Sequence, residues 1–311
     1  MLKHLTLVHN PELFSVGDYT TIAEEIRARC DDIKVFIYPD APLVRPRANL
    51  TAHPLMTFCP SVLQHFKAPR GRVFCGQSIG KDEQLRLLAK GGVRVPRWVY
   101  SRPNLRLSEY DWGPYVIVKP IRFGYATKGQ GIELARTDQY KHVSPAMMTL
   151  QGRTASNMIV QQFIDSGEYA EDYRVVTIFG SVLYALRRKS MIRLRRPDGD
   201  VTRTTEGVVS NASAGGGRDV TFCHDKDILA FASACYRAIP QVPFQAVDIR
   251  REAKGGRLYC FEINPGGHTW NFSSARTQRV PTIEGIRRED QFGAWAIAAD
   301  TLIEKTRLFA S

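Results

Sequence analysis

The chain has 311 residues, of which 43% are hydrophobic and 24% are charged, and its formal net charge is +12 at pH 7. This length allows about two globular domains, and no stretch approaches the ~18 apolar residues of a membrane span. The N-terminus is too polar for a signal peptide, and the six cysteines form no CxxC pair, so we expect a cytoplasmic protein with free thiols. The positive charge favours anionic partners: nucleotides, phosphorylated or carboxylate substrates, or nucleic acid, with no membrane partner.

The start of the chain alternates strand and helix patterns. Apolar residues predict a strand at 5–8, a helix at 19–28 and a strand at 33–38, which together indicate a β-α-β unit. The proline-containing stretches 42–46 and 52–60 are interpreted as loops.

Leucines at helical spacing predict a helix over 82–90 that ends at Gly91, followed by an extended segment at 93–100. The later elements are expected as strands at 115–118 and 159–164, a hairpin of 173–178 with 182–186, and helices at 225–239 and 292–308. Alternating elements followed by antiparallel hairpins predict an α/β or α+β chain of at least two units.

The most informative segment is a second hairpin, whose arms run from Phe244 to Ile249 and from Leu258 to Asn264. Glu262 and Asn264 are two residues apart, so their side chains lie on the same face of a strand. If the hairpin closes about Gly255, Asp248 lies opposite Glu262 on that face. Two carboxylates and an amide oxygen arranged in this way suit Mg²⁺ or Mn²⁺ that carries nucleotide phosphates. The alternative interpretation is a hairpin with a solvated acidic face. Cys260 has the same parity as Glu262, which would place it near this face.

Residues with phosphate-binding chemistry precede this hairpin in a definite order. Lys119 ends an apolar strand, and a lysine in that position can reach phosphates as a point charge. A basic loop with glycines at 124, 129 and 131 follows, and such a loop lets backbone N–H groups close over phosphates. The strand that ends at Ile164 can pair a base through its backbone, and the acidic stretch after it can bind ribose hydroxyls.

This ordered set, from about Lys81 to Asn271, resembles the ATP-grasp superfamily, in particular the carboxylate–amine ligases related to ribosomal-protein glutamate ligase and glutathione synthetase. The resemblance implies an N-terminal α/β domain at 1–98, an ATP-clamping lid at 99–160 and a second clamping subdomain with the metal site at 161–311. It also implies ATP and Mg²⁺ or Mn²⁺ as cofactors.

The resemblance assigns a role to each matching residue. Those that it implies for nucleotide binding are Lys81, Lys119, Gly124, Gly129, Gly131, Gln162, Phe163, Ile164, and Glu168 or Glu171 at the ribose. Those that it implies near the transferring phosphate are Arg174 and either Arg187 or Arg188. Asp248, Glu262 and Asn264 match the metal ligands. Gln162 departs from the glutamate that the family often has at this position.

The activity that the resemblance implies is ATP-dependent joining of a small carboxylate to an amine of an amino acid or peptide. The carboxylate takes the γ-phosphoryl group, the amine displaces it, and ADP and phosphate leave; binding and electrostatics carry the catalysis. One alternative is a kinase of the same fold that phosphorylates a hydroxyl. A second is a basic nucleic-acid-binding protein, which would leave the arrangement of Asp248, Glu262 and Asn264 without a purpose. The run 187–196 also lacks interleaved aromatic residues that could stack bases, so we do not expect nucleic acid as a partner. A homo-oligomer is compatible with the sequence.

Overall fold

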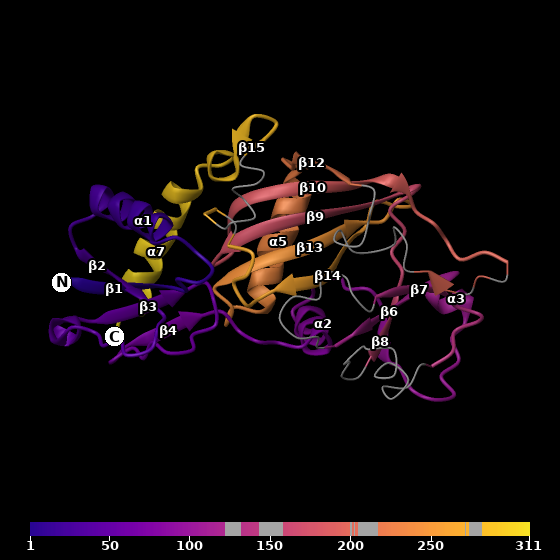
Figure 1. The fold of residues 1–311 in the computed structure, drawn as a ribbon, viewed down its shortest axis with the longest axis horizontal. Coiled ribbons are helices and arrows are strands. Elements are labelled where there is room, and N and C mark those ends of the chain that lie inside the picture. Colours follow the sequence, from indigo (N-terminus) through magenta and orange to yellow (C-terminus); the bar gives the residue numbers. More distant parts are fainter. Residues whose placement is uncertain are drawn as a thin grey trace.

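The computed structural model describes residues 1–121, 132–142, 158–199, 201, 203–204, 217–270, 272–273 and 282–311. Figure 1 shows three parts side by side: an α/β unit that contains both termini, a long antiparallel sheet with one helix across it, and a smaller sheet at the far end. In this part of the chain, no helix is both long and apolar enough to cross a bilayer.

The first part is a parallel sheet of four strands in the order β2-β1-β3-β4. Its strands are β1 (Lys3–His9), β2 (Ile33–Pro39), β3 (Leu55–Cys59) and β4 (Arg72–Cys75). Helix α1 (Val16–Arg29) joins the first two strands, and the side chain of Ser15 caps its N-terminus by accepting from Gly17 N–H. The expected β-α-β unit is therefore confirmed.

Strand β3 corrects the loop that was expected at 52–60. All five of its residues are buried, and it lies inside the sheet between β1 and β4. A strand buried on both faces reads as a continuous apolar run without alternation, so its period gives no strand signal. Pro54 and Pro60 flank the strand rather than interrupt it.

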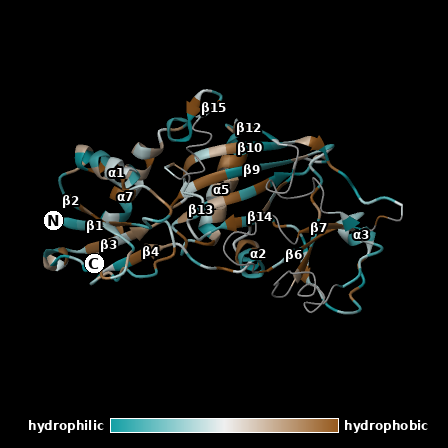
Figure 2. Ribbon diagram, viewed as in Figure 1, coloured by the Kyte–Doolittle hydropathy of each residue, from teal (hydrophilic) through white to brown (hydrophobic). Residues whose placement is uncertain are grey.

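The central sheet has the order β12-β10-β9-β13-β14 and is antiparallel throughout. Its strands are β9 (Tyr169–Ile178), β10 (Ser181–Arg193), β12 (Arg218–Phe222), β13 (Phe244–Arg251) and β14 (Leu258–Asn264). Helix α5 (Lys226–Ala238) packs on one face through Ile228, Ala232 and Cys235. In Figure 2, α5 and the strands that it crosses are largely hydrophobic.

The small sheet has the order β11-β7-β6-β8-β5. Its strands are β5 (Trp98–Tyr100), β6 (Tyr115–Pro120), β7 (Glu133–Arg136), β8 (Met158–Gln162) and the short β11 (Arg203–Thr204). Helix α2 (Lys81–Lys90) precedes this sheet and contacts β14 and α5, and the single turn α3 (Glu109–Trp112) contacts β6. Helix α2 therefore lies where the small and central sheets meet.

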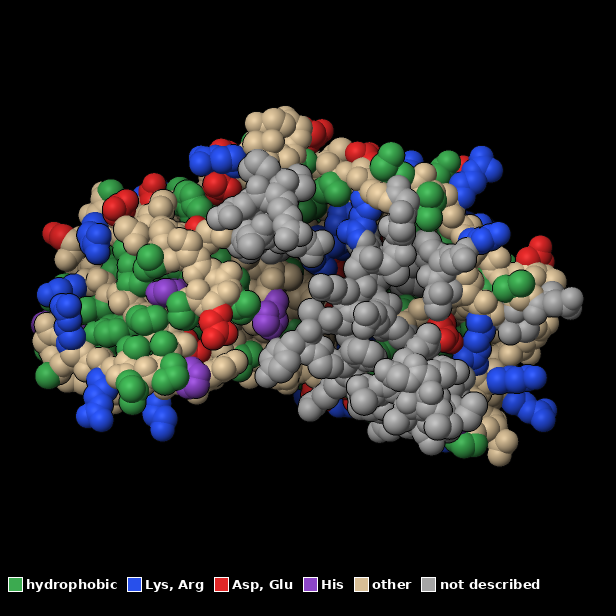
Figure 3. Space-filling view, viewed as in Figure 1, with side chains coloured by type: hydrophobic (Ala, Val, Ile, Leu, Met, Phe, Trp, Pro, Cys, Tyr) green, Lys and Arg blue, Asp and Glu red, His purple; other side chains and the backbone are tan. Residues whose placement is uncertain are grey.

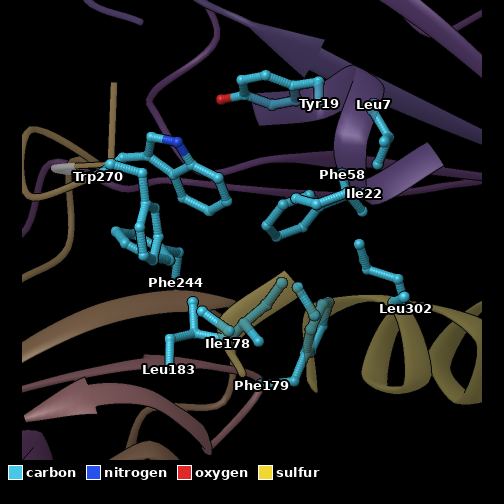
Figure 4. Close-up of a cluster of buried hydrophobic side chains, with 14 of the residues drawn as sticks. Leu7, Tyr19, Ile22, Phe58, Ile178, Phe179, Leu183, Phe244, Trp270 and Leu302 are labelled. Carbon is cyan, nitrogen blue, oxygen red and sulfur yellow. The ribbon is translucent and has the colours of Figure 1, made fainter. Parts of the chain in front are cut away.

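One hydrophobic cluster joins the N-terminal unit to the central sheet. Trp270 is fully buried between Tyr19 of α1 and Phe244 of β13, with ring centroids 5.6 and 5.2 Å away. Figure 4 shows Phe58, Ile178 and the other members around them.

The last helix, α7 (Ala294–Phe309), packs on α1 and β10, and it confirms the helix expected at 292–308. It follows the short hairpin of β15 (Thr282–Ile283) and β16 (Ile286–Arg287). The division at residues 98 and 160 stays a prediction, and α7 belongs by its contacts to the N-terminal unit.

Gly267 provides a test of how tightly the segment after β14 packs on the N-terminal unit. Its φ is +79°, and a Cβ atom there would lie 2.3 Å from Pro60 O. Gly267→Ala should therefore lower the free energy of unfolding by about 2–4 kcal/mol, through both the strained φ and the displaced backbone.

Gly285→Ala is the matched control, because Gly285 has the same φ of +79° and no atom within 4 Å of the added Cβ. It should cost only about 1 kcal/mol. Equal losses for the two variants in urea unfolding would show that the contact with Pro60 is not tight.

Candidate active site between the two antiparallel sheets

One face of the central sheet is hydrophobic and the other carries charge. Tyr173, Val175, Val247 and Ile249 point toward α5. Because neighbouring residues on a strand alternate between faces, the residues between them point the other way. The polar residues of this second face are Asp172, Arg174, Arg188, Asp248, Arg250, Glu262 and Asn264. In Figure 3, Lys and Arg side chains gather in the middle of the molecule, beside segments drawn in grey.

Asp248 is the centre of this charged face, and only 4% of its surface is exposed. Arg174 donates from Nε and Nη2 to its two carboxylate oxygens, at 2.8 and 2.7 Å. Arg188 Nη2 donates to Oδ1 at 2.9 Å, and Asn264 Nδ2 donates to Oδ2 at 3.1 Å. Burial alone would raise the pKa of Asp248, but the two arginines outweigh it and lower the pKa to about 2.

A second carboxylate completes a quartet of charges, of which all but Arg174 are buried. Arg188 Nε donates to Asp172 Oδ1 at 2.6 Å, and Arg188 and Asp172 are 6% and 3% exposed. Two arginines and two aspartates therefore share this part of the sheet, and their formal charges cancel. Such a quartet is stable when every member has its partner and is costly to break.

The hairpin that carries Glu262 has the predicted register, with one irregularity. Asp248 lies directly opposite Glu262, but the next pair is Ile249 with Cys260, so Phe261 is an extra residue in a β-bulge. The bulge reverses the facing of the residues before it. Cys260 therefore packs in the hydrophobic cluster under α5, which corrects the expectation from its parity.

Two lysines reach this hairpin from outside the central sheet. Lys81 Nζ, at the start of α2, lies 3.0 Å from Glu262 Oε1. Lys119 Nζ, on β6, donates to Phe261 O at 3.1 Å. Burial lowers the pKa of Lys119 to about 8, against the opposing effect of Glu262. The small sheet and the central sheet thus meet across a pair of cationic groups.

Arg187 and Glu171 lie on the other face of the sheet. Arg187 Nη2 donates to Glu171 Oε2 at 2.7 Å, and Tyr173, which packs under α5, donates to the same carboxylate. Neighbouring arginines on one strand cannot both point at Asp248, and the register selects Arg188. This arrangement does not support the roles expected of Arg187 near the phosphate and of Glu171 at the ribose.

The segment after β8 lies next to the polar face. Phe163 N–H donates to Tyr115 O at 3.3 Å, and Ile164 O accepts from Arg250 at 3.4 Å. Gln162 ends β8, and Glu168 forms an exposed ion pair with Arg193. The expected glycine loop, with Gly124, Gly129 and Gly131, lies outside the described residues.

The oxygen donors of the hairpin can supply part of the coordination of a metal ion, with the rest left to other ligands. Within the described residues, no three Asp, Glu, His or Cys side chains could hold a metal ion together. Asp248 and Glu262 are nonetheless opposite one another, with Asn264 beside them. Mg²⁺ keeps much of its water and commonly takes one or two carboxylates together with phosphate oxygens. Both oxygens of Asp248 already accept from Arg174, Arg188 and Asn264, so the set fits a metal that is held jointly with a phosphorylated ligand if Asp248 gives up one of these donors.

Comparison with known proteins identifies the fold of the chain. No family model matches the sequence, and no curated protein matches it. Among solved structures, D-cycloserine synthetase DcsG is similar with a TM-score of 0.54 and 16% identity, over 97% of this chain and 99% of that one. The ATP-grasp ligase PsnB complexed with minimal precursor is similar with a TM-score of 0.50 and 17% identity, over 98% and 100% of the chains.

The chain has the ATP-grasp fold. A second structure of PsnB, complexed with minimal precursor, Mg and ADP, has a TM-score of 0.50 and 15% identity, over 97% and 98% of the chains. The fold predicted from the sequence is confirmed. In this ATP-grasp fold, Lys119 of the small sheet and Glu262 of the central sheet lie on the two sides of the same junction.

Three residues at the charged face, Asp172, Arg250 and Phe261, were not predicted from the sequence. Asp172 and Arg250 are each two residues from a predicted site residue, Arg174 and Asp248, so strand parity alone would have placed them on the same face. Phe261 has no such signal, because the position of a bulge follows from pairing in space.

We expect the charge of Asp248 to contribute to the stability of the fold as well as to the geometry of the charged face. Asp248→Asn removes the carboxylate that Arg174 binds and leaves Arg188 with Asp172 alone, so the free energy of unfolding should fall by about 3–5 kcal/mol near neutral pH. Because the pKa of Asp248 falls from 3.8 to about 2 on folding, the difference should be fully present above pH 4 and should disappear as the pH falls toward 2.

Asp227→Asn is the control for this experiment. Asp227 binds Arg251 in an exposed ion pair, and its loss should cost about 1 kcal/mol or less. Denaturant unfolding of both variants between pH 2 and 7 measures the two effects. Equal small losses would contradict the central position of Asp248.

Proposed function

We propose that the chain is an ATP-dependent ligase that joins a carboxylate to an amine and releases ADP and phosphate. One observation supports this proposal above the others. Lys81 and Lys119 both contact the hairpin that carries Glu262 and Asp248, at the junction of the two sheets. Phosphoryl transfer that relies on positioning and electrostatics requires cationic groups that bind the phosphates. It also requires carboxylates that bind the metal ion of those phosphates.

In this proposal the nucleotide lies between the small sheet and the central sheet. Its base is held by the segment Gln162–Ile164, and its phosphates are held by Lys81, Lys119 and the loop that contains Gly124, Gly129 and Gly131. Glu168 is the remaining candidate for the ribose, because its exposed pair with Arg193 costs little to open.

Asp248, Glu262 and Asn264 would hold Mg²⁺ or Mn²⁺, which would neutralise phosphate charge during the reaction. A substrate carboxylate oxygen attacks the γ-phosphorus of ATP, and the bond to the β-phosphate oxygen breaks, which gives an acyl phosphate and ADP. The amine then attacks the acyl carbon and expels phosphate. Arg174 and Arg188 are proposed to orient the acid and to offset the charge that develops on the transferring group.

The substrates are proposed only by class: a small carboxylate and the amine of an amino acid or peptide. A further structure of PsnB, complexed with precursor peptide PsnA2 and AMPPNP, supports a peptide among the candidates. All six cysteines are free thiols, which supports the cytoplasm as the location.

The nucleotide product tests the reaction. With its true acid and amine, the enzyme should release ADP and phosphate in equal amounts, and hydroxylamine in place of the amine should yield a hydroxamate from the acyl phosphate. Coupled ADP assays on an amino-acid and peptide screen, followed by mass spectrometry of the products, measure both.

Glu262→Gln is the matched variant, because its side chain keeps its shape and loses the charge that faces Lys81. It should fold normally and lose turnover. AMP with pyrophosphate, or a phosphorylated hydroxyl with no amide, would contradict the ligase and would favour an adenylating enzyme or a kinase.

A further inference from the structure

Arg250 is a buried cation whose hydrogen-bonding groups are largely unused. Only 5% of its surface is exposed. Within the described residues, its side chain makes one hydrogen bond, from Nη1 to Ile164 O at 3.4 Å, and its Nε has no partner. The nearby charges include Asp172 and Asp165, but burial is the larger effect and lowers the pKa of Arg250. A guanidinium normally uses several of its five donors when it is buried.

Two aromatic rings fix the position of this guanidinium. Its Cζ lies 5.4 Å from the ring centroid of Phe261 and 5.9 Å from that of Phe163. Phe163 follows Gln162 at the end of β8, and the carbonyl of Phe261 binds Lys119. Arg250 therefore lies between the proposed base-binding segment and the proposed phosphate-binding lysine, with its position held by cation–π contacts.

This arrangement is costly for the protein without a ligand. A methionine or leucine could fill the space between the rings without burying a charge or an unsatisfied N–H. Arg251, the next residue, shows the contrast: it lies on the opposite face and pairs with Asp227 at 2.6 Å. The unused donors of Arg250 are thus left for an acceptor that the described residues do not supply.

We propose that Arg250 contacts the base of the bound nucleotide and selects among purines; this inference rests on the proposed nucleotide site. The N–H groups of an arginine donate to acceptors in the plane of a base. Guanine offers two acceptors, O6 and N7, on one edge, whereas adenine places a donor, N6–H₂, beside N7. Arg250 should therefore contribute more to the binding of GTP than to that of ATP.

The test is calorimetric titration of ATP, GTP and inorganic tripolyphosphate into the wild-type chain and Arg250→Met. Arg250→Met should raise the Kd of ATP about 10-fold and that of GTP about 100-fold, as expected for the loss of one or two charge-assisted hydrogen bonds. The Kd of tripolyphosphate, which has no base, should not change. The melting temperature should stay the same or rise, because an unpaired buried charge is removed.

Two further variants separate base recognition from structural effects. Arg251→Met removes an arginine from the same strand and should leave all three Kd values unchanged. Arg250→Lys keeps the charge without the planar fork, so it should retain most of its ATP affinity and lose the additional affinity for GTP. It also keeps the test valid if Arg250→Met fails to fold.

The outcomes distinguish the two proposals. If the wild-type chain binds neither nucleotide, the proposed function fails and this inference fails with it. If the wild-type chain binds ATP but the Arg250 variants bind ATP and GTP as the wild type does, the inference alone is overturned. A similar loss for tripolyphosphate would assign Arg250 to the phosphates and would also overturn base recognition.

Discussion

The buried carboxylate of Asp248, held between Arg174 and Arg188, is the interaction on which the charged face depends. Charges taken out of water are stable only while each has a partner. Arg188 Nε also donates to Asp172, so strands β9, β10 and β13 are tied together by charge as well as by backbone hydrogen bonds. This network fixes the direction of Asp248 before any ligand arrives, which is the condition for electrostatic preorganisation.

The same sheet supports both the core and the site because its strands are long enough to serve two purposes. Val176 and Ile178 of β9 pack against the N-terminal unit, and Arg174 on the same face joins the charged network. The segment after β14 then returns to the N-terminal unit at Trp270, whose Nε1 donates to Asp18 at 2.8 Å. A substrate bound near Asn264 would therefore lie beside a segment whose position depends on packing between the two parts.

The sequence was sufficient to predict features that depend on residues close together in the chain. Strand parity and one turn placed Asp248 opposite Glu262, and the order of motifs around Lys119 indicated the fold. The sequence was insufficient to predict features that depend on which residues are neighbours in the folded structure. The register between strands decides whether Arg187 or Arg188 faces Asp248, and strand pairing decides where the bulge at Phe261 lies. Strand β3 gave no alternating pattern because it is buried on both faces. Arg250 could be placed by parity, but the unpaired Nε of Arg250 is visible only once the surrounding described side chains are located.

We propose the binding of a nucleotide at the junction of the two sheets, together with a metal ion that Glu262 helps to hold. Its most direct test is the affinity of the chain for ATP, measured by calorimetry as the Mg²⁺ concentration is raised, in the wild type and in Glu262→Gln. We expect Mg²⁺ to tighten ATP binding to the wild type and to have a much smaller effect on the variant. Absence of ATP binding, or the same dependence on Mg²⁺ in both proteins, would contradict it.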